Sequence, residues 1–209
     1  MTDTKSKIIY QSIALFNQHG YSNVSLHQIA RSLDLSSGNL TYHYPKKADL
    51  MKAVYTTFLD DLSSLQTSSI GVGRGIDDML VELNEFIKFQ NRFLFFYIDL
   101  LDIGRNYPEI AQRHYGHIKA QIKRIEDYLN FNFSIGIIKS EVEGNLVVLA
   151  ETIWMTVVFY PSQMILRGHK NSQSNLLNMV SSLLKPYLKS DNYHLLDQTI
   201  ENIYSDITI

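Results

Sequence analysis

Ser36-Ser-Gly-Asn-Leu-Thr-Tyr-His-Tyr-Pro-Lys-Lys47 is the stretch that decides the fold. Small polar residues begin it, Leu40 is the only aliphatic residue before Pro45, and proline inside a helix removes a hydrogen bond and clashes with the preceding turn. A short helix is therefore predicted from residue 37 to about Tyr44. One apolar anchor with a run of outward hydrogen-bonding side chains is what the second helix of a helix-turn-helix needs in the major groove of DNA.

Two more helices are predicted before this stretch. Residues 5–19 repeat apolar side chains at three- and four-residue spacing, and Gly20 supplies the left-handed residue that ends many helices. Ser25-Leu-His-Gln28 matches a capping box, in which the serine hydroxyl and the glutamine side chain each bind a free backbone N–H. A second short helix should therefore follow Ser25, joined to the third by a tight turn at residues 34–36.

The third helix offers side chains that suit DNA. Asn39 can bind adenine through two hydrogen bonds, and the Thr41 methyl group can contact the methyl group of thymine. The other candidates either let the helix N-terminus come close to a phosphate or can donate to one: Ser36, Ser37, Gly38, Tyr42, His43 and Lys47. Spacing alone fits a polar turn on a helical bundle equally well.

The particular residues resemble the DNA-binding segment of the TetR family of regulators. The match runs without a gap over the first quarter of the chain and is carried by Ala14-Leu-Phe16, Gly20-Tyr21, Ser25, Ile29-Ala30, Ser37-Gly38-Asn39-Leu40, Tyr42-His43-Tyr44, Lys47 and Leu50. The resemblance implies an all-α fold: a three-helix DNA-binding domain with a helix-turn-helix, then a helical effector-binding and dimerisation domain. It also implies DNA contacts at Ser36, Ser37, Gly38, Asn39, Tyr42, His43 and Lys47, and Ser25, Thr41 and Lys46 complete our candidate set.

Two residues depart from the family pattern. Thr41 stands where the family usually has tyrosine, so a contact through that phenol is absent or replaced. Lys46 stands where a helix-capping serine is usual, which adds positive charge near DNA but gives up a cap that contributes about 1 kcal/mol. Both departures predict an individual operator preference.

The chain divides on composition. We expect a DNA-binding domain at 1–50, a connecting helix at 46–64 and an effector-binding and dimerisation domain at 65–209, because Ser63–Gly75 is rich in loop-forming Ser, Thr and Gly. Beyond it, helices are predicted at about 76–92, 93–104, 107–135, 144–168, 173–189 and 193–206.

The segment 144–168 is apolar nearly all round, which is typical of a helix buried on every side. Its second face should meet a ligand cavity or a partner subunit, and Pro161 should bend it or start a new segment. The resemblance implies that the helices near 144–168 and 173–189 form the homodimer interface; the alternative is a purely intramolecular core.

Aromatic residues are abundant in the second domain. They could line a pocket for a small apolar or aromatic effector, although ordinary core packing accounts for many of them. The candidate pocket residues are Phe96, Tyr97, Tyr128, Phe131, Trp154 and Phe159.

Composition excludes several classes of site. The chain has no cysteine, so disulfides and thiolate sites are absent.

The net charge is −2, yet residues 1–59 hold six Lys and Arg against three acids, which permits DNA binding without demanding it. The N-terminus lacks the apolar run of a signal peptide, and the run 153–161 is far shorter than the roughly 20 residues that span a bilayer. We therefore expect a cytoplasmic protein without a membrane segment.

No catalytic arrangement, metal set or cofactor motif stands out, and His114, His117 and Glu126 do not form a convincing metal set. The sequence predicts a homodimeric, ligand-responsive regulator that binds palindromic operator DNA; repression with release on ligand is usual in the family, and activation is the alternative. A helical binding protein that has lost operator recognition is a second hypothesis, and an enzyme is a third with no motif behind it.

Overall fold

The computed structural model describes residues 3–68, 75–169 and 173–205. Within these ranges every named element is helical, and the single pairing of extended residues is an isolated bridge between Ile138 and Leu188. The all-α prediction is confirmed. The chain forms two compact units, and each takes residues from two separate parts of the sequence.

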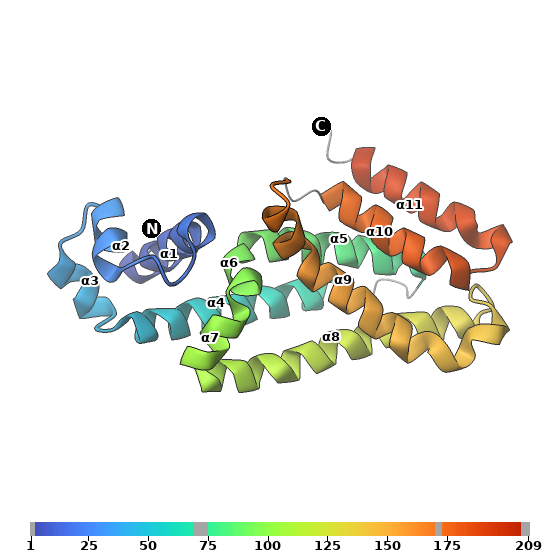
Figure 1. The fold of residues 1–209 in the computed structure, drawn as a ribbon, viewed down its shortest axis with the longest axis horizontal. Helices are drawn as coiled ribbons and strands as arrows, with labels where there is room; N and C mark the ends of the chain where they lie inside the picture. The colour runs from blue at the N-terminus through green and yellow to red at the C-terminus, as the bar shows by residue number, and fades with distance from the viewer. Residues whose placement is uncertain (1–2, 69–74, 170–172, 206–209) are drawn as a thin grey trace. The chain divides into compact units, whose positions relative to one another are not determined.

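The first unit contains residues 1–66 and 89–114. Its helices are α1 (Thr4–His19), α2 (Leu26–Ser32), α3 (Ser37–His43), most of α4 (Lys47–Ser68), α6 (Leu94–Ile98), α7 (Leu100–Asn106) and the first turns of α8 (Pro108–Ser134). The domain that we expected at 1–50 thus lies in a unit that also holds α6 and α7. Figure 1 draws α1, α2 and α3 close together at the N-terminal end of α4.

Local signals place the short helices where the sequence predicted them. The capping box at Ser25 is present: its Oγ accepts from the Gln28 N–H at 3.2 Å, and Gln28 Oε1 accepts from the Ser25 N–H at 2.7 Å. Gly20 follows α1 with φ +79°, a left-handed backbone that glycine adopts without strain. Leu40 is fully buried and anchors α3.

The turn between α1 and α2 is hydrogen-bonded to α7. The Tyr21 N–H donates to Asp99 Oδ2 at 2.7 Å, and the Ser22 hydroxyl donates to Asp102 Oδ2 at 2.7 Å. Asp99 also separates α6 from α7, where we had expected one continuous helix over 93–104. A tertiary hydrogen bond, not a local break signal, accompanies this interruption.

Aromatic rings fill the core of the first unit. Phe58 contacts Phe93 and Phe96 with ring centroids 5.2 and 4.9 Å apart, and Tyr55 stacks on Phe96 at 5.4 Å. His114 packs edge-on against Phe96 at 4.9 Å. Much of the aromatic abundance in the sequence therefore serves packing.

The second unit contains residues 67–88 and 115–209. It holds most of α5 (Ile76–Arg92), the rest of α8, α9 (Leu146–Leu166), α10 (Gln173–Leu184) and α11 (Tyr193–Ser205), with short 3-10 helices at Ser140–Asn145, Lys185–Tyr187 and Ser190–Asn192. Helices α10 and α11 lie side by side (Figure 1).

Helix α4 is longer than the sequence indicated. We expected a loop from Ser63, but α4 continues to Ser68, and the Ser64 hydroxyl donates to the Asp60 carbonyl at 2.9 Å. A serine that bonds back to its own helix can stay helical, which the composition argument overlooked. Residues 69–74 of the expected loop lie outside the described residues.

Helix α9 revises one expectation. The apolar run 153–161 is short, but the whole helix, 21 residues with Pro161 inside it, is long and apolar enough to cross a membrane by length and composition. One side of it is packed in the second unit through Ile153, Trp154 and Val157. Those buried contacts are what a core helix of a folded domain makes.

Candidate nucleic-acid interface and effector pocket

Helix α3 presents polar side chains around a single buried anchor. Ser36 caps it, with Oγ accepting from the Asn39 N–H at 3.1 Å. The side chain of Asn39 is exposed, and Tyr42 is 83% exposed with its ring edge-on to His43 at 5.2 Å. The candidate residues from Ser36 to His43 therefore lie on a capped helix that faces the solvent.

The hydroxyl of Thr41 is engaged inside the helix. It donates to the Ser37 carbonyl at 2.9 Å and lies 3.2 Å from the Gly38 carbonyl. The methyl group of this exposed side chain remains for an apolar contact from outside. This geometry suits the methyl contact that we predicted for Thr41 in place of the usual tyrosine phenol.

Gly38 has no structural reason to be glycine. Its φ is not positive, and a Cβ added there would meet only the Ser36 Oγ at 4.0 Å. Glycine inside a helix lowers stability by about 0.5–1 kcal/mol relative to alanine. The bare backbone at this position thus serves nothing that the chain itself contains.

The two lysines before α4 differ. The Lys47 Nζ donates to the Tyr21 carbonyl at 2.6 Å and lies 4.1 Å from the centre of the Tyr21 ring, while burial lowers the pKa of this ammonium. Lys46 is exposed, and its N–H donates to Asp49 Oδ2 at 3.1 Å, so a carboxylate caps the start of α4 although serine is missing. A phosphate contact by Lys47 stays a prediction, and sequence reasoning missed its contact with Tyr21.

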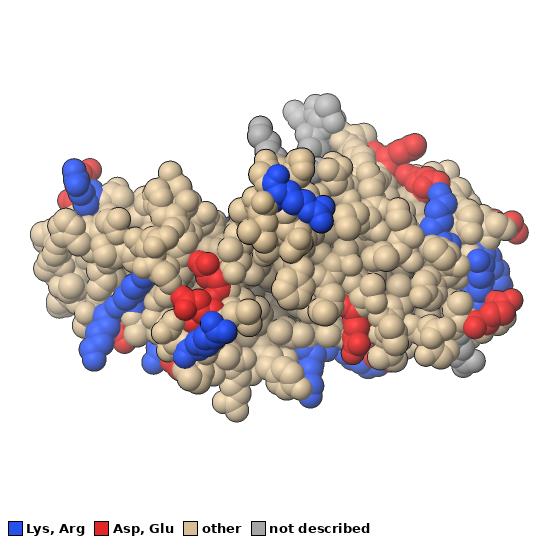
Figure 2. Space-filling view, viewed as in Figure 1, with Lys and Arg blue, Asp and Glu red and all other residues tan. Residues whose placement is uncertain are grey.

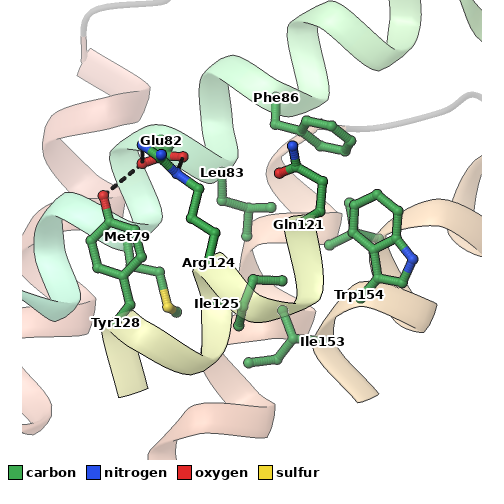
Figure 3. A pocket seen from close by; sticks show the side chains of 11 residues that line it. Met79, Glu82, Leu83, Phe86, Gln121, Arg124, Ile125, Tyr128, Ile153 and Trp154 are labelled. Carbon is green, nitrogen blue, oxygen red and sulfur yellow. Dashed lines mark hydrogen bonds and ion pairs between the residues drawn. The ribbon is translucent and has the colours of Figure 1, made fainter. Parts of the chain in front are cut away.

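A groove in the second unit lies between α5, α8 and α9 (Figure 3). It has about 450 Å³ of empty space, counted out to the solvent at its mouth. The walls are mostly apolar, and the lining residues are Met79, Glu82, Leu83, Phe86, Gln121, Arg124, Ile125, Tyr128, Ile153, Trp154 and Val157.

One end of the groove holds a closed set of polar groups. Two guanidinium nitrogens of Arg124, Nε and Nη2, donate to the Glu82 carboxylate, Nη2 at 2.8 Å. The Tyr128 hydroxyl donates to Glu82 Oε2 at 2.6 Å. The hydrogen bonds from Arg124 raise the pKa of its guanidinium, and burial together with Glu82 raises the pKa of the Tyr128 phenol. The charges at this end therefore cancel within the protein.

The other end combines aromatic rings with an amide. Phe86 and Trp154 lie 5.6 Å apart between ring centroids, and Gln121 reaches toward them from α8 (Figure 3). The Gln121 Nε2 is buried and has no hydrogen-bond partner among the described residues. His117 packs edge-on against Trp154 at 6.2 Å, and burial lowers the pKa of its imidazole to about 4.

The expected effector residues are not all in this groove. Tyr128 and Trp154 line it; Phe96 and Tyr97 lie buried in the first unit, and Phe131 and Phe159 are exposed. The sequence analysis missed Glu82, Arg124 and Gln121. Gln121, Arg124 and Tyr128 share one face of α8 at three- and four-residue spacing, which is a signal that could have found Gln121 and Arg124 but not Glu82 on α5.

The described residues contain no group of three or more His, Asp or Glu that could hold a metal ion. The polar groups at the groove are a carboxylate, a guanidinium and a phenol that bind one another, together with one amide. These groups suit binding of a small molecule.

Comparison with known proteins identifies the family. Residues 8–54 match the family model described as "Bacterial regulatory proteins, tetR family", and residues 55–196 match the model described as "Bacterial transcriptional repressor". The chain belongs to the TetR family of bacterial transcriptional regulators.

Individual relatives and structures are more distant. The chain is 26% identical over 193 residues to the biofilm operon icaADBC negative transcriptional regulator IcaR of Staphylococcus aureus, covering 88% of this chain and 99% of IcaR. It is 32% identical over 82 residues to the probable transcriptional regulator YttP of Bacillus subtilis, which is 38% of this chain and 40% of YttP. A crystal structure of a TetR-family regulator from Marinobacter aquaeolei superposes with a TM-score of 0.84 at 22% identity, covering 96% and 98% of the two chains.

Proposed function

We propose that this chain is a homodimeric repressor that binds a palindromic operator through α3 and leaves it when a small, mainly apolar effector occupies the groove between α5, α8 and α9. The observation that carries the DNA-binding half is the exposed polar surface of α3 around Gly38. A Cβ at Gly38 would meet no obstacle in the chain, so the missing side chain serves close approach by an outside partner. A capped helix N-terminus with free backbone N–H groups suits a phosphate there.

A face of α9 supports the homodimer. Val148, Met155 and Phe159 are exposed by half or more, and with Thr152 they recur at four-, three- and four-residue spacing. This is the spacing of a seam between two packed helices. Figure 2 shows few Lys, Arg, Asp or Glu side chains over α9 and α10, as a surface that pairs with a second copy requires.

Chain continuity supports regulation of α3 by the groove. Helices α5 and α8 line the groove, and both continue into the first unit. At the end of α5, the Arg92 carbonyl accepts from Asn17 Nδ2 on α1 at 2.9 Å, and Asn17 Oδ1 accepts from the Phe95 N–H at 2.9 Å. A ligand that favours one position of α5 would shift the population of DNA-binding states through α1.

The proposal involves no catalytic step and places the protein in the cytoplasm with the chromosome. A gel-shift titration on DNA upstream of its own gene tests it. We expect binding that depends on a palindrome and falls steeply with salt; no shift on any such fragment contradicts the proposal.

Asn39→Ala sharpens the same assay. Loss of the bidentate contact should relax preference at one base pair per half-site by about 1–3 kcal/mol. Asn130→Ala removes an exposed amide on α8 and is the matched control, expected to leave operator preference unchanged.

A further inference from the structure

The two ends of the groove treat polar ligand groups differently. At one end, the Glu82 carboxylate takes two hydrogen bonds from Arg124 and one from Tyr128. A ligand carboxylate placed there would compete for a guanidinium that is already bound and would stand beside the Glu82 carboxylate. Two neighbouring carboxylates disfavour their shared ionised state. This end therefore rejects an anion.

The groove also disfavours a cationic ligand. Among the residues that the structure describes, Glu82 is the only acidic one that lines the groove, and its charge is balanced by Arg124. A second cation would have to displace that guanidinium from its bidentate partner. The remaining walls, formed by residues such as Leu83, Ile125 and Ile153, offer no charge to compensate for a desolvated ion.

At the other end, Gln121 offers a donor. The residue is 8% exposed, and its Nε2 is buried without a hydrogen-bond partner among the described residues. Figure 3 shows this amide beside Phe86 and near Trp154, with apolar side chains between it and the Arg124 pair. A buried donor without an acceptor is unfavourable, and a bound acceptor would remove that cost.

We propose that the groove selects a neutral, mainly apolar molecule with one carbonyl-type hydrogen-bond acceptor, and that the Gln121 amide binds this acceptor. Gln121 is then the residue that sets ligand specificity, and Phe86 and Trp154 flank the acceptor group. The inference deepens the proposed function, because it names the chemistry of the effector for the same groove.

Trp154 makes the test direct, since it is the only tryptophan in the chain and lines the groove. Its fluorescence in the full-length protein is titrated with three nine-carbon probes: 2-nonanone, nonanoate and 1-nonene. The ketone accepts a hydrogen bond but cannot donate one. We expect it to bind about 3- to 10-fold more tightly than the alkene, the range for one net hydrogen bond, and at least roughly tenfold more tightly than the anion.

Gln121→Leu removes the donor at similar size. We expect ketone affinity to fall about 3- to 10-fold while alkene affinity is kept or raised, and retained alkene binding shows that the variant is folded. Gln112→Leu changes an exposed glutamine of the same helix and should alter neither affinity. The proposal is overturned if nonanoate binds as tightly as the ketone, if Gln121→Leu leaves ketone affinity unchanged, or if no probe binds.

Operator binding, measured in parallel by gel shift, separates this inference from the proposed function. If the protein does not prefer the ketone, but another small molecule releases it from the operator, the proposed ligand class is rejected and the repressor function is retained. Ketone binding through Gln121 without any operator binding keeps the ligand class and rejects the repressor.

Discussion

Helices α3 and α9 both leave side chains uncovered, but of opposite chemistry. Helix α3 buries only Leu40 and exposes hydroxyl, amide and aromatic groups on a capped N-terminus. Helix α9 buries one apolar side and exposes another, including Met155 and Phe159. An exposed polar helix complements a hydrated polyanion, whereas an exposed apolar helix complements a surface like itself. The contrast supports the proposal that α3 meets DNA and that α9 meets a second copy.

The largest effect should come from breaking the apolar face. Phe159→Glu places a charge in the proposed seam, and an unpaired charge buried at an interface is strongly unfavourable. We expect dimers to give way to monomers in sedimentation and operator affinity to fall by roughly 100-fold or more, because a monomer holds one half-site. Ile135→Glu, at an exposed apolar residue after α8, is the control. A dimer that survives Phe159→Glu would contradict this role of α9.

On α3, the buried anchor and its exposed neighbour should separate stability from binding. Leu40→Ala leaves a cavity at a fully buried site and should lower the free energy of unfolding by about 2–5 kcal/mol. Tyr42→Ala should change it by less than about 0.5 kcal/mol, yet weaken operator binding. Denaturant melts and gel shifts on both variants measure this; equal destabilisation by the two substitutions would remove the distinction.

Acid should destabilise the second unit, because His117, which packs against Trp154, becomes protonated. The folded pKa of this histidine is lowered to about 4, below its ordinary 6.5. The unfolded chain therefore takes up a proton first, and stability is lost as pH falls from 6.5 toward 4, by at most about 3 kcal/mol. Melts of His117→Gln should lose this part of the pH dependence, and those of His169→Gln, at an exposed position, should keep it.

Gly38→Ala gives the smallest and most specific effect. The added Cβ makes only an ordinary contact with the Ser36 Oγ at 4.0 Å, so the substitution should raise the free energy of unfolding by about 0.5–1 kcal/mol, while a methyl group at the proposed DNA-facing surface should lower operator affinity. Gly116→Ala, where an added Cβ meets nothing within 4 Å, should stabilise α8 and leave operator binding unchanged. Unchanged affinity in Gly38→Ala would show that the backbone at this position stays clear of DNA.

The sequence was informative where structure is local. The capping box at Ser25 and the stop at Pro45 depend on neighbours within four residues, so they could be predicted. The Glu82–Arg124 pair joins residues 42 positions apart, and no periodicity in the sequence predicts such a pair. The abundance of aromatic residues led us to choose Phe96 as a pocket residue, because composition alone does not distinguish a ring in a core from a ring in a pocket.

The hydrogen bond from Tyr21 to Asp99 has a practical consequence for protein engineering. Regulators are recombined by fusing the DNA-binding segment of one to the sensing segment of another, with a junction in the connecting helix. Here the turn between α1 and α2 depends on a carboxylate some 78 residues later in the chain, and Phe16 of α1 packs against Phe95 at 5.1 Å. A hybrid built from residues 1–66 of this chain would carry α3, the proposed operator-binding helix, without the contacts that support the turn before α2, so α6 and α7 should be transplanted together with it.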